Sequence, residues 1–342
     1  MCGTRLADLL RMRGVPFLLA EARDELGGRI RTLRLDTPAS YADLGPAWIW
    51  PHQPRVLDLV DELGLRTFQQ HIRGQLVFEQ SPALPARRLD MATMGGSLRL
   101  EGGLGTLVDG LAARIDPARL RLGAGLRRLE RTGHGVRASF EDGAVIEARQ
   151  VVLAMPPRVV ASSLELQPDL PDTTLLALRS VPTWMAGHAK AVAIYDTPFW
   201  RERGLNGDAI SHVGPLGELH DASPHDLAVG ALFGFFAQPA AWRQAHRAEL
   251  EALVLAQLER LYGEPAGSPT RLHIQDWARD PLVAVEADAR MLREHPQYGP
   301  LPASSGDWAG ILHLSGTELA PAEGGYVEGA LVAAEATMVA LG

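Results

Sequence analysis

An acidic residue at the end of an apolar run is the first sign of chemistry in this chain. Residues 15–20 (VPFLLA) are mostly apolar and lead into Glu21, and Gly27-Gly28-Arg29 follows shortly after. In dinucleotide-binding βαβ units, the acid that closes the second strand hydrogen-bonds an adenosine ribose and stands about 20 residues after a glycine loop. We therefore interpret Glu21 as a candidate for such an acid.

A short helix is expected in front of this strand. Leu6, Leu9 and Leu10 share one helical face, Gly3 begins the helix and Gly14 ends it. The order is thus glycine, helix, strand and acid. We expect the chain to lack the first strand of the βαβ unit and the first two glycines of its G-x-G-x-x-G motif.

The composition limits the class of protein. The chain has 342 residues, of which 46% are hydrophobic, so it can form one large or two ordinary globular domains. A net charge of −8 without a basic run argues against nucleic acid and an anionic membrane as partners. The sequence has no run of 18 apolar residues and no signal pattern. We expect a cytoplasmic protein that acts on a small molecule.

The segment around Glu21 resembles the flavin-containing amine oxidases, a family that includes monoamine and polyamine oxidases. The family carries L-E-A-R-x-x-x-G-G-R after its glycine loop, and this chain has Ala20-Glu21-Ala22-Arg23 and then Gly27-Gly28-Arg29. Four more family segments follow in order over nearly the whole chain. The resemblance implies that FAD is bound through Gly3, Glu21, Ala22, Arg23, Gly28 and Arg29.

The second segment resembles D-x-G-G-A-W-I, whose backbone lies along the isoalloxazine ring in the family. Here it reads Asp43-Leu44-Gly45-Pro46-Ala47-Trp48-Ile49. Pro46 stands where the family usually has glycine, so one backbone donor is lost. The resemblance implies flavin contacts from Gly45, Pro46, Ala47 and Trp48. A buried turn with a core tryptophan is the alternative interpretation.

Other family segments imply further cofactor contacts. Four strands are expected between Leu120 and Ala148, with a hairpin turn at Asp142-Gly143, and the resemblance implies that the backbone of Leu126 meets the adenine. The apolar strand 151–154 ends at Ala154 before two prolines, like the family's A-x-P-P.

The C-terminal segment resembles a strand that ends in A-G-T-E and a helix that starts with G-Y-x-x-G-A. A helix N-terminus aimed at the flavin stabilises the negative charge of the reduced ring. The contacts implied here come from Gly316, Thr317, Glu318, Gly325 and Val327.

Two residues are candidates for catalysis. Lys190 is the single lysine beside 32 arginines, and it lies in a segment that resembles the family's K-x-x-x-x-Y-x-x-P-F-W-R. In the family this lysine holds a water near flavin N5, a task that suits a compact ammonium better than a planar guanidinium. Tyr326 matches one wall of the family's aromatic cage, and Trp277 lies near the place expected for the other. A surface lysine and a core tyrosine are the alternatives.

A metal site is not expected. His212, His220 and His225 with Asp221 fit no known ligand spacing, and solvated loop histidines are the simpler interpretation. The single cysteine, Cys2, lies far from where some family members attach flavin covalently, so we expect FAD to be bound without a covalent bond.

These observations predict an α/β fold with two parts. One is a Rossmann-like, glutathione-reductase-type FAD-binding domain without its first strand, formed by residues 1–55, 96–160 and 305–342. The other is a smaller α+β substrate domain, formed by residues 56–95 and 161–304. The resemblance implies oxidation of an amine C–N bond by hydride transfer to flavin, which oxygen or another acceptor reoxidises. The alternative is a truncated or degenerate non-catalytic relative that binds FAD weakly.

Overall fold

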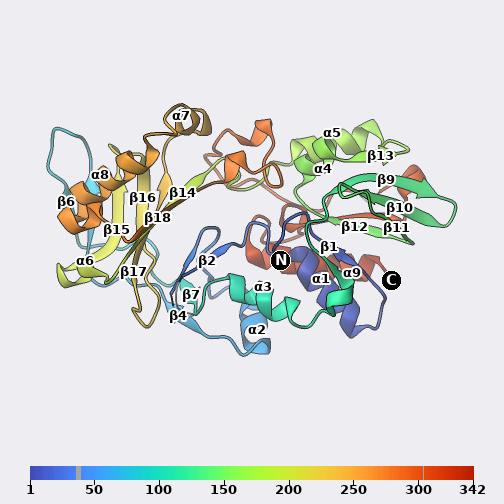
Figure 1. Ribbon diagram of the computed structural model, residues 1–342, viewed down its shortest axis with the longest axis horizontal. Helices are drawn as coiled ribbons and strands as arrows, with labels where there is room; N and C mark the ends of the chain where they lie inside the picture. Colours follow the sequence, from blue (N-terminus) through green and yellow to red (C-terminus); the bar gives the residue numbers. More distant parts are fainter. Residues whose placement is uncertain (36–39, 303) are drawn as a thin grey trace.

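The chain folds into an elongated mixed α/β structure in a computed structural model that describes residues 1–35, 40–302 and 304–342. Figure 1 shows a seven-stranded sheet at one end of the long axis and a four-stranded sheet at the other. Helices α1, α2, α3 and α9 lie between them, and the N-terminus is near the middle of the molecule. None of the helices in these ranges is long and apolar enough to cross a membrane.

The larger sheet has the strand order β18-β14-β17-β16-β15-β5-β6. Alternate residues of β14 face opposite sides of the sheet and belong to two different hydrophobic clusters. Ala191, Ala193 and Tyr195 pack with Val254 and Leu258 of helix α8, so this face forms a core. The bounds are β5 (Gln75–Glu79), β6 (Arg87–Leu89), β14 (Ala189–Tyr195), β15 (Leu205–Ser211), β16 (Leu216–Asp221), β17 (Gly230–Phe236), β18 (Arg271–Asp276) and α8 (Leu250–Tyr262).

The smaller sheet has the order β11-β10-β9-β13. Strand β10 pairs antiparallel with both β9 and β11, and Gly143 takes φ +85° in the turn between β10 and β11. The hairpin predicted at Asp142-Gly143 is therefore confirmed. The bounds are β9 (Leu126–Thr132), β10 (Gly135–Phe140), β11 (Val145–Ala148) and β13 (Glu165–Gln167).

Two short parallel pairs flank helix α1. Strand β1 (Leu19–Ala20) pairs with β8 (Leu120–Arg121), and β12 (Val151–Ala154) pairs with β19 (Leu312–Ser315). In the described ranges no strand joins one pair to the other. Helix α1 (Cys2–Met12) spans both, because a Cβ built on Gly3 lies 3.4 Å from Ala154 Cβ and 3.6 Å from Leu19 Cδ1.

The prediction of a strand over residues 15–20 was too long. Only Leu19 and Ala20 are in β1, and they pair on one side alone. An apolar run becomes a strand only where it finds hydrogen-bond partners, and residues 15–18 find none in a neighbouring described strand.

The sequence pattern also predicts an apolar strand over residues 227–236, an amphipathic helix over 245–262 and a helix over 107–115, and the structure has all three with shifts at their ends. The strand predicted from Leu227 begins at Gly230, because Leu227 takes φ +56°. The helix predicted from Ala245 begins at Leu250, after a separate α7 (Ala240–Ala245), and ends before Gly263 at φ +93°. Helix α3 (Gly105–Ala112) begins two residues earlier than predicted.

Helix α9 (Val327–Ala340) packs against two other helices. It packs on α1 through a core that includes Leu6, Ala330 and Ala334, and on α2 (Pro54–Glu62). The remaining elements are β2 (Thr32–Arg34), β3 (Tyr41–Asp43), β4 (Thr67–Gln69), β7 (Leu98–Leu100), α4 (Pro157–Ser163), α5 (Asp172–Ser180) and α6 (Phe199–Glu202). The division of the chain into two domains stays a prediction.

Candidate active site

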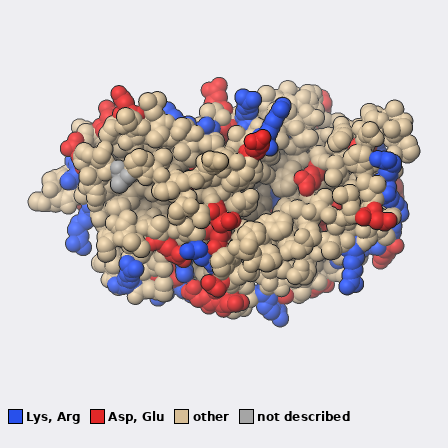
Figure 2. Space-filling model, turned by 180° about the vertical axis from the view of Figure 1, so that it is seen from behind, with Lys and Arg blue, Asp and Glu red and all other residues tan. Residues whose placement is uncertain are grey.

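A large cavity of about 2440 Å³ lies among these elements. Ordinary small-molecule sites have volumes of roughly 300 to 1,000 Å³, so this one has room for a cofactor together with a substrate. Figure 2 shows that the face opposite to that of Figure 1 is hollowed near its middle, with basic and acidic side chains interspersed around it.

Every residue that the sequence assigned to cofactor binding or catalysis lines this cavity. They come from separate parts of the chain and include Gly3, Glu21, Ala22, Arg23, Gly28, Arg29, Gly45, Pro46, Ala47, Trp48, Leu126, Ala154, Lys190, Gly316, Thr317, Glu318, Gly325, Tyr326 and Val327. The structure thus brings them together, while the role of each stays a prediction.

Two helix N-termini border the cavity. Helix α1 begins after Met1 and α9 begins after Tyr326, and neither has a hydrogen bond from a capping side chain. The first N–H groups of a helix have no partner within it, and the helix dipole makes this end favourable for negative charge. Both ends therefore offer donors to an anionic group such as a pyrophosphate.

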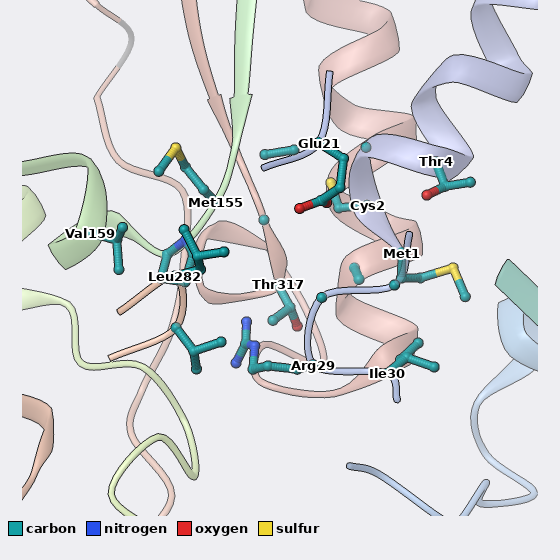
Figure 3. Close-up of a pocket in the computed structure, with 18 of the residues that line it drawn as sticks. Met1, Cys2, Thr4, Glu21, Arg29, Ile30, Met155, Val159, Leu282 and Thr317 are labelled. Atoms are coloured by element: carbon teal, nitrogen blue, oxygen red, sulfur yellow. The ribbon is translucent and has the colours of Figure 1, made fainter. Parts of the chain in front are cut away.

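Glu21 is held at the end of β1 by its backbone. Its N–H donates to Arg121 O (2.9 Å), and its carbonyl accepts from Ala124 N–H (2.8 Å). Its Oε1 accepts from Arg23 N–H (3.0 Å), and the carboxylate lies beside Cys2 at the start of α1 (Figure 3). A carboxylate fixed at this place is a suitable acceptor for ribose hydroxyl groups.

Arg23 makes a contact that its sequence motif does not suggest. Its Nη2 lies 2.5 Å from Asp280 Oδ2, in the segment that follows β18. The guanidinium therefore lines the cavity and also ties two distant parts of the chain together.

Arg29, which is partly exposed, and the buried Glu318 form an ion pair on the cavity wall. Arg29 Nη1 lies 2.6 Å from Glu318 Oε1, and Nη2 donates to Oε2 at 2.9 Å. Burial lowers the pKa of Arg29, but the Glu318 carboxylate outweighs this and raises it. Figure 3 shows Arg29 beside Thr317, whose hydroxyl donates to Tyr326 O (2.6 Å), across from Met155, Val159 and Leu282.

The turn from Gly45 to Trp48 passes close to the chain at Arg29. A Cβ on Gly45 would lie only 1.9 Å from Arg29 O, so no other residue fits there. The indole of Trp48 packs against Phe233 at 5.2 Å and donates to Gln70 Oε1 at 3.1 Å. Trp48 therefore packs against the core and also lines the cavity. Both interpretations, a core tryptophan and a cavity residue, are compatible with this position.

Lys190 is buried, with 2% of its surface exposed. Its Nζ donates to Asp43 O (2.7 Å) and Gly45 O (3.1 Å), and lies 3.8 Å from the ring centroid of Phe233. Burial lowers its pKa to about 7, against the opposing effect of Asp43. An ammonium has three donors, so one remains for a further acceptor such as a water.

Tyr326 stacks on His295, with ring centroids 5.1 Å apart and planes 6° from parallel. Trp277 borders the cavity too, but it is 7% exposed, and its indole N–H points to Leu44 O at 3.4 Å. The sequence missed the stacking partner, because His295 lies in a segment without a regular pattern. It also missed Trp184, which lines the cavity and makes an edge contact with His295.

Sequence reasoning also missed the contribution of strands β15 to β17. Ile210, Glu218 and Phe235 line the cavity beside Lys190. The period-2 pattern within each strand shows only which residues of that strand share a face. Which strands lie next to β14 depends on long-range pairing, so no local signal could have placed them here.

The interpretation of His220 as a solvated loop histidine was wrong: it is fully buried in strand β16 and lies between two carboxylates. Its Nδ1 is 3.1 Å from Asp208 Oδ1, and its Nε2 is 3.1 Å from Glu218 Oε1. Burial lowers the pKa of His220, but these carboxylates outweigh the effect and raise it. In the described ranges no group of three or more His, Cys, Asp or Glu side chains could hold a metal ion.

This donor set fits FAD. Two helix ends without a capping side chain can face anionic groups, and the Glu21 carboxylate can accept from a ribose. The expectation that FAD binds here is thus supported by the chemistry of the cavity wall as well as by the sequence motifs.

Comparisons with known proteins identify relatives of the whole chain. A sequence model of the family "Flavin containing amine oxidoreductase" matches residues 1–78 and 71–338. A putative flavin-containing monoamine oxidase, AofH, of Mycobacterium tuberculosis is 30% identical, with 96% of this chain and 92% of that protein covered. A probable flavin-containing monoamine oxidase A of Dictyostelium discoideum is 29% identical over 68% of this chain, which spans 50% of that relative's length.

A solved structure of a putrescine oxidase mutant has the same fold. It aligns with a TM-score of 0.80 at 20% identity and covers 99% of this chain and 96% of that one. At this identity the likeness shows the fold alone. Together with the family match, it shows that the chain belongs to the flavin-containing amine oxidoreductases and is an amine-oxidase-like oxidoreductase.

Proposed function

We propose that the protein binds FAD without a covalent bond and oxidises the C–N bond of a small amine by hydride transfer, with oxygen or another acceptor taking up the electrons. The observation that supports this most is the single cavity that joins the ends of α1 and α9 with Glu21, Trp48 and Lys190. When bound, FAD supplies the hydride acceptor.

The residues of the chain have positioning and electrostatic tasks in this proposal. Glu21 and the α1 end hold the nucleotide part, while the α9 end stabilises negative charge at the ring. Trp48, Phe235 and Tyr326 form apolar and aromatic walls that exclude water and orient the substrate. Lys190 holds a water with its remaining donor.

The test uses protein purified in the presence of FAD. Its absorption spectrum should show bound flavin, acid precipitation should release yellow flavin to the supernatant, and an amine added without oxygen should bleach the visible bands. Flavin that stays in the pellet would contradict the non-covalent claim. Bound flavin that no amine bleaches would contradict the oxidase claim.

A second candidate is a non-catalytic relative with weak FAD binding. The observation that favours it is the absence, in the described ranges, of a strand between the pairs β1–β8 and β12–β19. In that case the purified protein carries little flavin even after reconstitution, and the cavity stays accessible to other ligands.

A further inference from the structure

A short loop carries one residue of the cavity wall. Residues 90–97 connect β6, at the edge of the seven-stranded sheet (Figure 1), to β7, which pairs with β4. Met94, in the middle of this loop, lines the cavity. In the described ranges the backbone of residues 92–96 makes no hydrogen bond to backbone outside the loop. The position of the loop therefore depends on side chains that reach it from elsewhere.

Two side chains of strand β15 hold the loop. Asn206 is fully buried and donates from Nδ2 to Met91 O (2.9 Å). The Asp208 carboxylate is 1% exposed, and its Oδ2 accepts from both the N–H (2.9 Å) and the hydroxyl (3.0 Å) of Thr93. Gly207 takes φ +86° where the register of β15 with β5 shifts, and such a bulge re-aims the neighbouring side chains. The two side chains beside the bulge consequently reach the loop.

A buried histidine fixes the Asp208 carboxylate. His220 Nδ1 lies 3.1 Å from Asp208 Oδ1 and 3.2 Å from the hydroxyl oxygen of Thr93. His220 itself is fully buried and makes an edge contact with Trp48, with ring centroids 4.9 Å apart. Hydrogen bonds to a carboxylate are stronger than those between neutral groups, and two donors of Thr93 share one carboxylate oxygen here. We refer to Thr93, Asp208 and His220 as the latch.

The end of the loop has room to move when the latch opens. A Cβ built on Gly95 or Gly96 meets no atom within 4 Å, and Gly96 takes φ +85°, which glycine adopts without strain. Hinge residues absorb changes of φ and ψ, so two adjacent glycines in open space suit this task. Met94 lies between these glycines and Thr93 in the chain. Opening of the latch therefore moves a residue of the cavity wall.

We propose that Asp208, held by His220, is a positioning residue that keeps this loop closed over the cavity, so that Met94 encloses the outer end of a bound amine. The part that concerns the amine rests on the proposed function, whereas the latch does not. Ile210, two residues after Asp208 in β15, also lines the cavity, and its strand lies three strands from that of Lys190. This is about 14 Å at the usual strand separation. The latch therefore acts far from Lys190, on binding more than on the chemical step.

Hydrogen exchange in the protein purified with FAD measures the latch without turnover. In Thr93→Val, which removes one donor and keeps the shape of the side chain, the amides of residues 90–97 should exchange about 10 to 100 fold faster. Thr270→Val is the matched control, because the N–H (2.7 Å) and the hydroxyl (2.9 Å) of Thr270 also share one acceptor, Ile194 O, away from the cavity lining. Unchanged exchange in Thr93→Val, or an equal increase in Thr270→Val, would overturn the proposal.

Amine binding tests the role of Met94. Decylamine spans roughly 12 Å at about 1.2 Å for each bond, so it can reach the loop from Lys190, whereas propylamine cannot. Decylamine should therefore slow the exchange of residues 90–97 in the wild type, and propylamine should not. In Met94→Ala this protection should weaken, and the KM for decylamine should rise by about 3 to 10 fold with kcat less affected. Protection by both amines, or by neither, would contradict the proposal.

The exchange measurements separate this proposal from the proposed function. If no amine bleaches the flavin, but the loop exchanges faster in Thr93→Val and decylamine protects it, the latch stands and the oxidase claim fails. If amines bleach the flavin, but neither Thr93→Val nor decylamine changes the exchange of the loop, the latch fails and the oxidase claim stands.

Discussion

Lys190 behaves differently in the structure from what its sequence position suggests. The motif suggests a partly solvated ammonium whose replacement barely affects the fold. The structure buries it, with two of its donors on carbonyl oxygens of Asp43 and Gly45 and its pKa lowered to about 7. Burial of a charged group always links stability to pH.

The first prediction concerns that link. In the unfolded chain Lys190 keeps its ordinary pKa of 10.5, whereas in the folded chain it loses its proton near pH 7. Between these values the unfolded state binds one proton more, so the free energy of unfolding rises with pH. The free energy of unfolding of the wild type, relative to that of Lys190→Met, should rise by up to about 1.4 kcal/mol per pH unit between pH 7 and 9.5. Urea unfolding of both FAD-free proteins at several pH values measures this, and parallel profiles would contradict it.

The second prediction concerns turnover. If the ammonium supplies fixed positive charge for the reaction of the reduced enzyme with oxygen, Lys190→Met should slow this half-reaction by about 10 to 1,000 fold. Anaerobic reduction by substrate should change less. Lys190→Arg should rescue only part of the rate, because the charge returns but the geometry does not.

The lowered pKa of Lys190 also predicts a pH dependence of the oxygen reaction, which stopped-flow traces can measure. In the wild type the oxygen reaction should slow as the pH rises through about 7, since the ammonium loses its proton there. In Lys190→Met this pH dependence should be absent. Unchanged oxygen reactivity in Lys190→Met with FAD fully bound would show that Lys190 only supports the fold.

At the scale of elements, α9 supports α2 as well as the cofactor site. Glu328, in the first turn of α9, is 1% exposed, and its carboxylate accepts from the N–H of Arg55 (3.1 Å) and of Val56 (2.9 Å). Helix α2 has no hydrogen bond from its own capping side chain. A carboxylate from another helix therefore takes the place of a cap.

This contact gives the third prediction. Glu328→Ala should lower the free energy of unfolding by about 2 to 4 kcal/mol, because it leaves buried N–H groups of α2 without partners. Glu335→Gln is the control, since Glu335 is 40% exposed and pairs with the half-exposed Arg55, so its loss should cost less than about 1 kcal/mol. Chemical unfolding of the two variants measures the difference. Equal effects would show that Glu328 does not act as a cap.

Elements with local signals could be predicted from the sequence, and their long-range arrangement could not. The strands of the β9–β10–β11 meander and the apolar β12 follow from alternation, turn residues and prolines nearby in the chain. Strand β5, however, pairs in parallel with β15 across more than a hundred residues. Such pairing has no local signature, and for the same reason Glu218 could not be placed opposite Phe235.

At the scale of the whole molecule, the cavity is enclosed by contacts between distant segments. Arg23 reaches Asp280, Arg158 lies 2.5 Å from Asp288, and Trp277 points to Leu44. The family motifs predicted residues that gather around one cavity, because each motif keeps its place in the fold. The cavity wall formed by Ile210, Glu218 and Phe235 lies in segments without a family motif, so these lining residues could be identified only from the structure.

The parallel pairs β1–β8 and β12–β19 are the place where we expect FAD binding to be strengthened. Each pair has an edge that finds no further strand in the described ranges, and Gly3 of α1 lies against Ala154 and Leu19 from the two pairs. A strand between them would satisfy these edges, and a glycine turn after it would bring backbone N–H groups to the pyrophosphate.

The last prediction is that such a strand, fused ahead of Met1, strengthens FAD binding. The added segment would be about 15 residues long, with an apolar strand that ends in Gly-x-Gly, because a strand buried on both faces needs apolar residues throughout. Each new backbone bond to a charged phosphate contributes roughly 1.5 to 3 kcal/mol, so two of them should lower the Kd about a hundredfold or more. Fluorescence titration of FAD measures the Kd, and a fusion of the same length made of glycine and serine is the control. Equal affinity for the original chain and both fusions would show that α1, Glu21 and Arg29 already hold the nucleotide without a further strand.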